Sequence, residues 1–250
     1  MNAARLADLM REDQPCVVLT GAGVSTESGI PDFRSPTGIW AQFDPLEYAS
    51  LDAFQRNPEK VWRFYAPRFE MLISAKPNRA HRALAELEEL GYVRAIVTQN
   101  IDVLHRRAGS RDVVEVHGSI ATCSCPGCGS SYTLEDVLPM LEQASEQSMA
   151  PRCASCGAVL KPDVVFFGEL LPAAEVDRAY ELARGARLCL VIGSALEVYP
   201  VAELPLETLR AGGRLAIVNR GPTALDSRAN VRVEGGAGEV LAALVEELRR

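Results

Sequence analysis

A glycine-rich stretch at positions 21–35, GAGVSTESGIPDFRS, holds residue types that suit phosphate binding. It follows the apolar run 16–19 (CVVL), which is typical of a buried strand, so the glycines come where a parallel strand would end. Ligands of α/β folds bind at that edge of the sheet. Because Gly21 and Gly23 lack Cβ, backbone N–H groups there can approach a phosphate, and the Ser25 hydroxyl is close by. The stretch therefore predicts a dinucleotide or phosphate site.

The same stretch departs from the dehydrogenase fingerprint G-x-G-x-x-G. Thr26 stands where the third glycine would fall, and the next glycine is Gly29, which weakens a hydride-transfer interpretation. Positions 21–23 alone also fit a plain strand-to-helix turn. Positions 30–34 (IPDFR) favour a site, because a proline, a carboxylate, an aromatic ring and a phosphate-binding guanidinium rarely share one plain loop.

The cysteines predict a metal centre. Four of the seven form two Cys-x-x-Cys pairs with 24 residues between them: Cys125, Cys128, Cys153 and Cys156. Four thiolates suit tetrahedral zinc and fill its coordination shell, so the ion would hold the structure together and not do chemistry. Free thiols are the alternative. Cys123 is expected to be a bystander, and Cys16 and Cys189 lie in apolar runs as ordinary buried residues.

Of the three histidines, His117 is the candidate base. It follows the predicted strand 113–116 (VVEV), which places it at a strand's carboxyl end. An imidazole with an ordinary pKa of about 6.5 can accept a proton at physiological pH. His81 and His105 lie in helical stretches among arginines, and we expect them to occupy ordinary helix faces.

Together these motifs resemble the sirtuins, the NAD-dependent protein-lysine deacylases. After the glycine-rich stretch, further pieces agree in order across about residues 16–220: Thr98-Gln99-Asn100-Ile101-Asp102, His117-Gly118, the two cysteine pairs, Gly193-Ser194 and Val218-Asn219. The resemblance implies that NAD is a consumed co-substrate. The acyl-lysine carbonyl oxygen attacks C1′ of the nicotinamide ribose, and the products are nicotinamide, free lysine and 2′-O-acyl-ADP-ribose.

The resemblance also implies residue roles. His117 activates a ribose hydroxyl, Asn100 and Asp102 bind the nicotinamide carboxamide and its ribose, and Gln99 orders the ribose hydroxyls. For Asn100 and Asp102 a polar strand-end turn is the alternative. Phe33 shields the reactive sugar face, and Asn219 bonds the adenosine ribose. The pyrophosphate is held by Ala22, Ser25, Arg34 and Ser194. The full set expected to bind NAD is Gly21, Ala22, Gly23, Ser25, Asp32, Phe33, Arg34, Gln99, Asn100, Ile101, Asp102, Gly193, Ser194 and Asn219.

The segment 164–169 (VVFFGE) resembles the sirtuin segment that pairs with an extended acyl-lysine peptide, with 197–199 on the peptide's other side. Such pairing forms hydrogen bonds to the peptide backbone, so it accepts peptides of many sequences. A core strand is the alternative for VVFF. The expected substrate contacts are Val164, Phe166, Phe167, Gly168, Glu169 and Val198.

Tyr65 and Arg68 are three positions apart, so on a helix they would share a face. In sirtuins that prefer succinyl, malonyl or glutaryl lysine, a Tyr-x-x-Arg in this region binds the acyl carboxylate, and we hypothesise the same here. Pro67 lies between them, where it would disturb the helix. In the alternative, Tyr65 packs and Arg68 is solvated.

The fold predicted around these residues is α/β. Strands at 16–19, 95–98, 113–116, 188–192 and 215–218 alternate with helices, among them 3–12 and 78–90, which indicates a Rossmann-like parallel sheet with helices on both faces. Two insertions break this order and form a small lobe, a helical one at 38–74 and a zinc-binding one at 121–161. The NAD-binding domain is then 1–37, 75–120 and 162–250.

Composition excludes several classes. The 250 residues are 48% hydrophobic, and 26 basic against 33 acidic residues give a net charge of −7 without a long basic cluster, which argues against nucleic-acid binding. The N-terminus mixes charges into its apolar positions, and no apolar run approaches the ~18 residues of a membrane span. We expect a soluble, cytoplasmic monomer. A mono-ADP-ribosyltransferase and a non-catalytic NAD or acyl-peptide sensor stay open as alternatives.

Overall fold

Six parallel strands form the main sheet of the computed structural model, which describes residues 2–33, 35–143 and 150–250. The strands are β1 (Cys16–Thr20), β2 (Ala95–Thr98), β3 (Val113–Glu115), β7 (Leu188–Ile192), β8 (Arg214–Asn219) and β9 (Val231–Glu234). Their order in the sheet is β3-β2-β1-β7-β8-β9. The order reverses between β1 and β7, and a crevice at such a switch point is where α/β sheets bind ligands. The predicted Rossmann-like sheet is confirmed.

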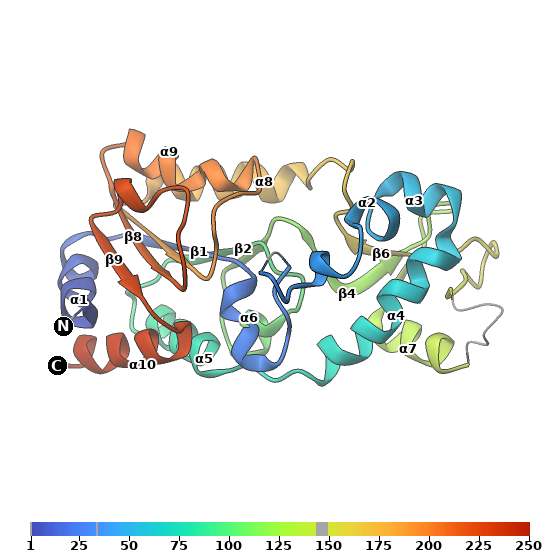
Figure 1. The fold of residues 1–250 in the computed structure, drawn as a ribbon, viewed down its shortest axis with the longest axis horizontal. Coiled ribbons are helices and arrows are strands. Elements are labelled where there is room, and N and C mark those ends of the chain that lie inside the picture. Colours follow the sequence, from blue (N-terminus) through green and yellow to red (C-terminus); the bar gives the residue numbers. More distant parts are fainter. Residues whose placement is uncertain (1, 34, 144–149) are drawn as a thin grey trace.

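Helices cover both faces of this sheet (Figure 1). One face packs against α1 (Asn2–Glu12), α5 (Arg79–Glu89) and α10 (Ala237–Leu248), and the other against α8 (Ala173–Gly185) and α9 (Leu204–Arg210). Alternate residues of a strand serve the two cores: Val18 faces the first, and Val17 and Leu19 face the second. Burial on both faces explains why the strands read as unbroken apolar runs.

The small lobe lies beside the sheet, on the right in Figure 1. Its helices are α2 (Pro45–Tyr48), α3 (Leu51–Arg56), α4 (Pro58–Ser74) and α7 (Leu134–Glu142), and its antiparallel strands are β4 (Gly118–Ser124), β5 (Ser131–Thr133) and β6 (Lys161–Val164). Both insertions contribute to one core, in which the Trp62 indole N–H of α4 donates to the Leu160 carbonyl at 2.7 Å. The small lobe built from two insertions is confirmed; the residue boundaries of the domains stay a prediction.

Several details differ from the sequence-based expectation. The antiparallel sheet and β9 were not expected, because β4 and β5 are rich in small and polar residues, and β6 and β9 are short and carry charges or a proline. Helix α4 continues through Pro67 to Ser74, so the expected disturbance is absent from this described helix. Pro67 is exposed, as is Arg63 four residues earlier, and the carbonyl that loses its helical partner can therefore bond to water.

The remaining local structure is short. Asn78 caps α5 through its side-chain oxygen, which accepts the N–H of Ala80 at 2.8 Å, and Gly91 ends the helix with φ of 82°, as the sequence indicated. Single 3-10 turns occupy Ala22–Val24, Thr26–Ser28, Ile39–Ala41, Val201–Glu203 and Asp226–Arg228. Among the described helices, none combines the length and apolar character that crossing a membrane requires.

Candidate active site

A cavity of about 1290 Å³ opens at the carboxyl ends of the central strands and reaches into the small lobe. Every described residue that we expected to contact NAD or substrate lines it; Arg34 lies outside the described residues. On the expected cofactor side these are Gly21, Ala22, Gly23, Ser25, Asp32, Phe33, Gln99, Asn100, Ile101, Asp102, His117, Gly193, Ser194 and Asn219. On the expected substrate side they are Tyr65, Arg68, Val164, Phe166, Phe167, Gly168, Glu169 and Val198.

The glycines after β1 are required for a different reason than the one expected. The N–H of Gly21 donates to Ile192 O at 3.1 Å and that of Gly23 to Gly193 O at 2.9 Å, so neither points at a ligand. A Cβ on Gly21 would come within 2.8 Å of Gly193 O, and one on Gly193 within 2.4 Å of Val24 N. These glycines therefore let the loops after β1 and β7 pack backbone to backbone and shape the floor of the crevice.

Ser25 is the centre of a buried polar cluster. Its hydroxyl donates to Asp102 Oδ2 at 2.6 Å and accepts from the side-chain amide of Asn100 at 3.0 Å. All three residues are buried, with Ser25 only 1% exposed. These hydrogen bonds fix the orientations of Asn100 and Asp102, and the expected pyrophosphate contact of Ser25 stays a prediction.

The Asp102 side chain is also fixed by a backbone donor. Its Oδ1 accepts the N–H of Leu104 at 2.9 Å, the first residue of α6 (Leu104–Arg107). Between them, Val103 has φ of 58°, a left-handed conformation that is rare for a β-branched residue. Strain of this kind persists where the surroundings impose it, commonly at functional sites. The sequence contains no signal for it.

One hydrogen bond fixes the orientation of the His117 ring. Its Nδ1 lies 3.0 Å from the backbone carbonyl of Gln99, an acceptor only, so Nδ1 carries a proton and donates to it. The side-chain amide of Gln99 donates in turn to Ser194 Oγ at 3.0 Å. An imidazole held in a fixed orientation at the cavity wall is an arrangement that a general base requires.

The residue after His117 lets β6 approach this histidine closely. Gly118 has φ of 74°, and a Cβ there would lie 2.0 Å from Asp163 O, so only glycine fits. The N–H of Val165 then donates to His117 O at 2.9 Å. The segment that follows β6 therefore lies directly beside His117.

Backbone groups in part of that segment already form hydrogen bonds within the small lobe. The N–H of Phe167 donates to Ala49 O at 2.8 Å, and its carbonyl accepts from Leu51 N at 3.0 Å. A carboxylate oxygen of Glu169 accepts the N–H of Phe166 at 2.7 Å and the ammonium of Lys161 at 3.0 Å. Residues 164–167 therefore belong to the small lobe's own structure, and their expected contacts with a substrate stay a prediction.

Tyr65 and Arg68 both face the cavity from α4. Tyr65 is 9% exposed and stacks on Phe166 with ring centroids 5.4 Å apart. Burial raises the pKa of its phenol, so it stays a hydrogen-bond donor. The Arg68 guanidinium lies 3.6 Å from the ring centroid of Phe64 and 4.7 Å from that of Phe43, and one of its nitrogens donates to Phe64 O. These contacts hold the half-buried Arg68 in place, while Tyr65 packs as the alternative expected, so the role of the pair stays a prediction.

We expected His81 and His105 to occupy ordinary helix faces, but both side chains are buried. They are 0% and 2% exposed, and their rings meet edge to face 4.9 Å apart beneath the cavity. Desolvation lowers the pKa of His81 to about 4, with Asp102 opposing and Arg82 adding to the shift. Burial likewise lowers the pKa of His105, aided by His81. Arginine neighbours in the sequence gave no hint of this burial.

These two imidazoles predict a loss of stability in acid. Their folded pKa values lie below the ordinary value of about 6.5, so the unfolded chain binds more protons below that pH, and unfolding becomes easier as pH falls from 6.5 towards 4. Each neutral imidazole contributes up to about 1.4 kcal/mol per pH unit. Urea unfolding at pH 7 and pH 5.5 measures the slope. We expect His105→Gln, which cannot titrate, to lose part of it; an unchanged slope would contradict the prediction.

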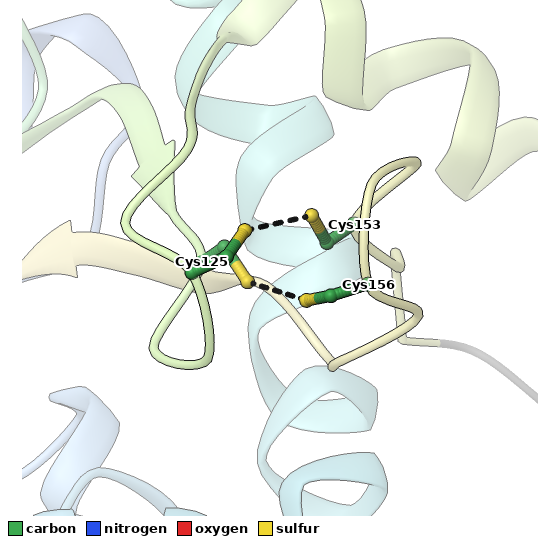
Figure 2. Close-up of side chains that lie close together, drawn as sticks. Cys125, Cys153 and Cys156 are labelled. Carbon is green, nitrogen blue, oxygen red and sulfur yellow. Dashed lines mark hydrogen bonds between the residues drawn. The ribbon is translucent and has the colours of Figure 1, made fainter.

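The four paired cysteines converge in the small lobe. Their sulfur atoms all lie within 4.8 Å of one another, with Cys125 and Cys156 3.4 Å apart and Cys128 and Cys153 3.5 Å apart. Figure 2 shows the thiols of Cys125, Cys153 and Cys156 meeting from two loops. These separations exceed a disulfide bond of about 2.05 Å and are close to the ~3.8 Å expected around tetrahedral zinc. The donor set fits one structural zinc ion, and Cys123 is buried in the core away from it.

Comparison with known sequences gives one result across the chain. The profile of the Sir2 family matches residues 21–200. The NAD-dependent protein deacylase 2 of Pyrobaculum aerophilum is 46% identical over 245 residues, 98% of this chain and 95% of that protein. The NAD-dependent protein deacetylase of Sulfurisphaera tokodaii is 43% identical over 249 residues, 100% of this chain and 97% of that protein.

Solved structures agree. A Sir2 structure with deacetylated p53 peptide and 3′-O-acetyl ADP-ribose superposes with a TM-score of 0.93 at 43% identity, covering 99% of this chain and 98% of that chain. Sir2Tm bound to a propionylated peptide gives a TM-score of 0.89 at 42% identity, with the same coverage of both chains.

Proposed function

The chain belongs to the Sir2 family of NAD-dependent protein deacylases, and we propose that it transfers the acyl group of an acyl-lysine to ADP-ribose, with His117 as the base. The observation that carries this proposal is the Nδ1–H bond from His117 to Gln99 O, which fixes the orientation of an imidazole that lines the cavity. Bound NAD supplies nicotinamide as the leaving group and ribose hydroxyls as acceptors of the acyl group.

The residues around the base have separate tasks in this proposal. Asn100 and Asp102, fixed by Ser25, bind the nicotinamide end, while Gln99, held by Ser194, orients ribose hydroxyls for His117. Asn219, the last residue of β8, lines the cavity, and in this proposal it bonds to the adenosine ribose. Phe33 lies over the cavity beside Trp40, with ring centroids 5.4 Å apart, where it can exclude water from the reacting sugar.

The acyl peptide binds as an added strand in this proposal. Residues 168–171 and 197–199 both line the cavity, and an extended chain bound between them would bond to both. Structures of relatives with deacetylated and propionylated peptides support a peptide substrate. Recognition of main-chain groups makes the enzyme tolerant of sequence, and the acyl-lysine side chain then points inward to His117.

We further propose that short acidic acyl groups such as succinyl are preferred. The Tyr65 phenol and the Arg68 guanidinium face the cavity from one side of α4, and the guanidinium is immobilised by Phe64 and Phe43. A fixed cation and a phenol can both bond to a carboxylate, whereas an acetyl group offers them no partner. The Glu169 carboxylate is already paired with Lys161, which limits its repulsion of an acidic acyl group.

Arg68→Met tests this preference. The substitution removes one charge-assisted hydrogen bond to the acyl carboxylate, which contributes about 1.5–3 kcal/mol. We therefore expect kcat/KM for succinyl peptide to fall roughly 10–100-fold, while kcat/KM for acetyl peptide stays within about threefold of wild type. The measurement is the rate on one lysine peptide in acetylated and succinylated forms. Arg63→Met, an exposed arginine on the same helix outside the cavity lining, is the matched control and should change neither rate. An unchanged ratio in Arg68→Met would refute the acidic-acyl proposal and leave an ordinary deacetylase.

A further inference from the structure

A second chain of polar groups runs beneath the cavity and meets the Ser25 cluster at Asn100 and, through the ring contact of His105, at His81, whose Nε2 lies 3.4 Å from Ser25 Oγ. Thr20 and Thr98 are the last residues of β1 and β2 and face each other in register. The Thr20 hydroxyl donates to Thr98 Oγ1 at 2.8 Å, and Thr98 Oγ1 also accepts the backbone N–H of Asn100 at 3.1 Å. His105 Nε2 lies 2.9 Å from Thr20 Oγ1. A continuous chain of hydrogen bonds therefore leads from α6 to the backbone of Asn100.

The direction of these bonds fixes the state of His105. Because the Thr20 proton is given to Thr98, Thr20 Oγ1 must accept a proton from His105, so Nε2 is protonated and Nδ1 holds the lone pair. Within the part of the chain that the structure describes, this buried Nδ1 has no hydrogen-bond partner. Burying an unpartnered nitrogen costs stability, and an apolar residue of similar size would avoid that cost. The feature that distinguishes the imidazole from such an apolar residue is the one hydrogen bond that it donates to Thr20.

Two chains of hydrogen bonds meet at Asn100. The chain from His105 holds the backbone N–H, and Ser25 holds the side-chain amide at 3.0 Å. The backbone of the preceding residue is fixed as well, since the N–H of Gln99 donates to Thr20 O at 3.0 Å. Thr20, Thr98 and His105 are all at most 2% exposed, so water cannot replace these bonds.

We propose that His105 is a positioning residue that acts through Thr20 and Thr98 to hold Asn100 in the orientation that binds nicotinamide. This inference rests on the proposed function, because it assigns Asn100 to the nicotinamide end of NAD. His105 itself touches no substrate. Its effect should therefore concern nicotinamide and NAD, and leave the acyl-peptide groove unchanged.

The test compares variants that cut the chain with one that keeps it. Thr20→Val and His105→Leu remove the donated bond at nearly constant volume, whereas His105→Gln retains an N–H donor of similar reach. We expect the first two to raise the nicotinamide inhibition constant and lower kcat/KM for NAD by about 10-fold, because small misplacements in a site have effects of that size. In these two variants the dissociation constant of acyl peptide, measured without NAD, should stay within about twofold of wild type. His105→Gln should stay within about threefold of wild type in all three constants.

A double variant sharpens the test. Thr20→Val combined with His105→Leu should be no worse than the more severe single variant, because both interrupt the same chain. Thr98→Val provides an independent cut if either variant fails to fold. With an active wild type, the positioning role is overturned if these variants lower the melting temperature but leave the nicotinamide inhibition constant unchanged. It is also overturned if the effects of Thr20→Val and His105→Leu on that constant add in the double variant. A wild type without nicotinamide release would overturn the proposed function as well.

Discussion

Replacing His117 with alanine should lower kcat for deacylation by about 10²–10⁴, the range that a positioned general base contributes. In the proposed reaction His117 activates a ribose hydroxyl after nicotinamide has left. No other imidazole can substitute, because His81 and His105 are buried beneath the cavity with the pKa of each lowered by desolvation. The measurement is single-turnover conversion of acyl peptide, with product detected by mass.

The position of the base in the sequence of steps gives this prediction its control. Exchange of labelled nicotinamide into NAD needs only the first bond cleavage, so His117→Ala should keep exchange that depends on acyl peptide. Peptide affinity should also stay close to wild type. A variant that binds peptide normally but loses exchange and deacylation together would place His117 in the first step, and a loss of less than about 10-fold would remove it as the base.

Removing one zinc ligand should have the other large effect. Structural zinc sites in small domains contribute on the order of 10 kcal/mol to folding. Cys125 and Cys153 are buried in the core of the small lobe, whose helix α4 also carries Tyr65 and Arg68. Cys153→Ser should therefore abolish bound zinc, unfold the lobe and abolish deacylation. Metal analysis by mass spectrometry, together with thermal unfolding, measures both consequences.

Cys123 is the matched control for the zinc prediction. It lies two residues from Cys125 and is fully buried, but it is not one of the four converging thiols. Cys123→Ala should keep one zinc ion per chain and lose only about 1–2 kcal/mol of stability from the deleted sulfur. Zinc retained by Cys153→Ser, or lost by Cys123→Ala, would refute the assignment of the four ligands.

The parts of the fold that could be predicted are those with strong local patterns. Runs such as 188–192 (LCLVI) are strands because both faces of a parallel sheet are buried, and Asn78 and Gly91 mark the ends of α5 by known capping chemistry. The strand β9 was missed because it pairs on one side only, so its charged Arg232 and Glu234 hid the pattern.

The candidate site was predictable as a set of residues but not as a network. Motif spacing indicates which side chains reach one edge of the sheet, and they line one cavity. It could not show that Ser25 bonds to Asp102, or that Gly23 packs on Gly193, because these contacts join distant segments. The burial of His105 could not be predicted either, because two of the four residues of α6 are arginines, which indicate an exposed helix.

The central claim is that the acyl group moves from lysine to ADP-ribose, and one measurement tests it directly. The enzyme is incubated with NAD and an acyl-lysine peptide, and every product is quantified by mass. We predict equal amounts of nicotinamide, deacylated peptide and O-acyl-ADP-ribose. Free acid with NAD left intact, or ADP-ribose attached to protein with the acyl group still on the peptide, would contradict the account.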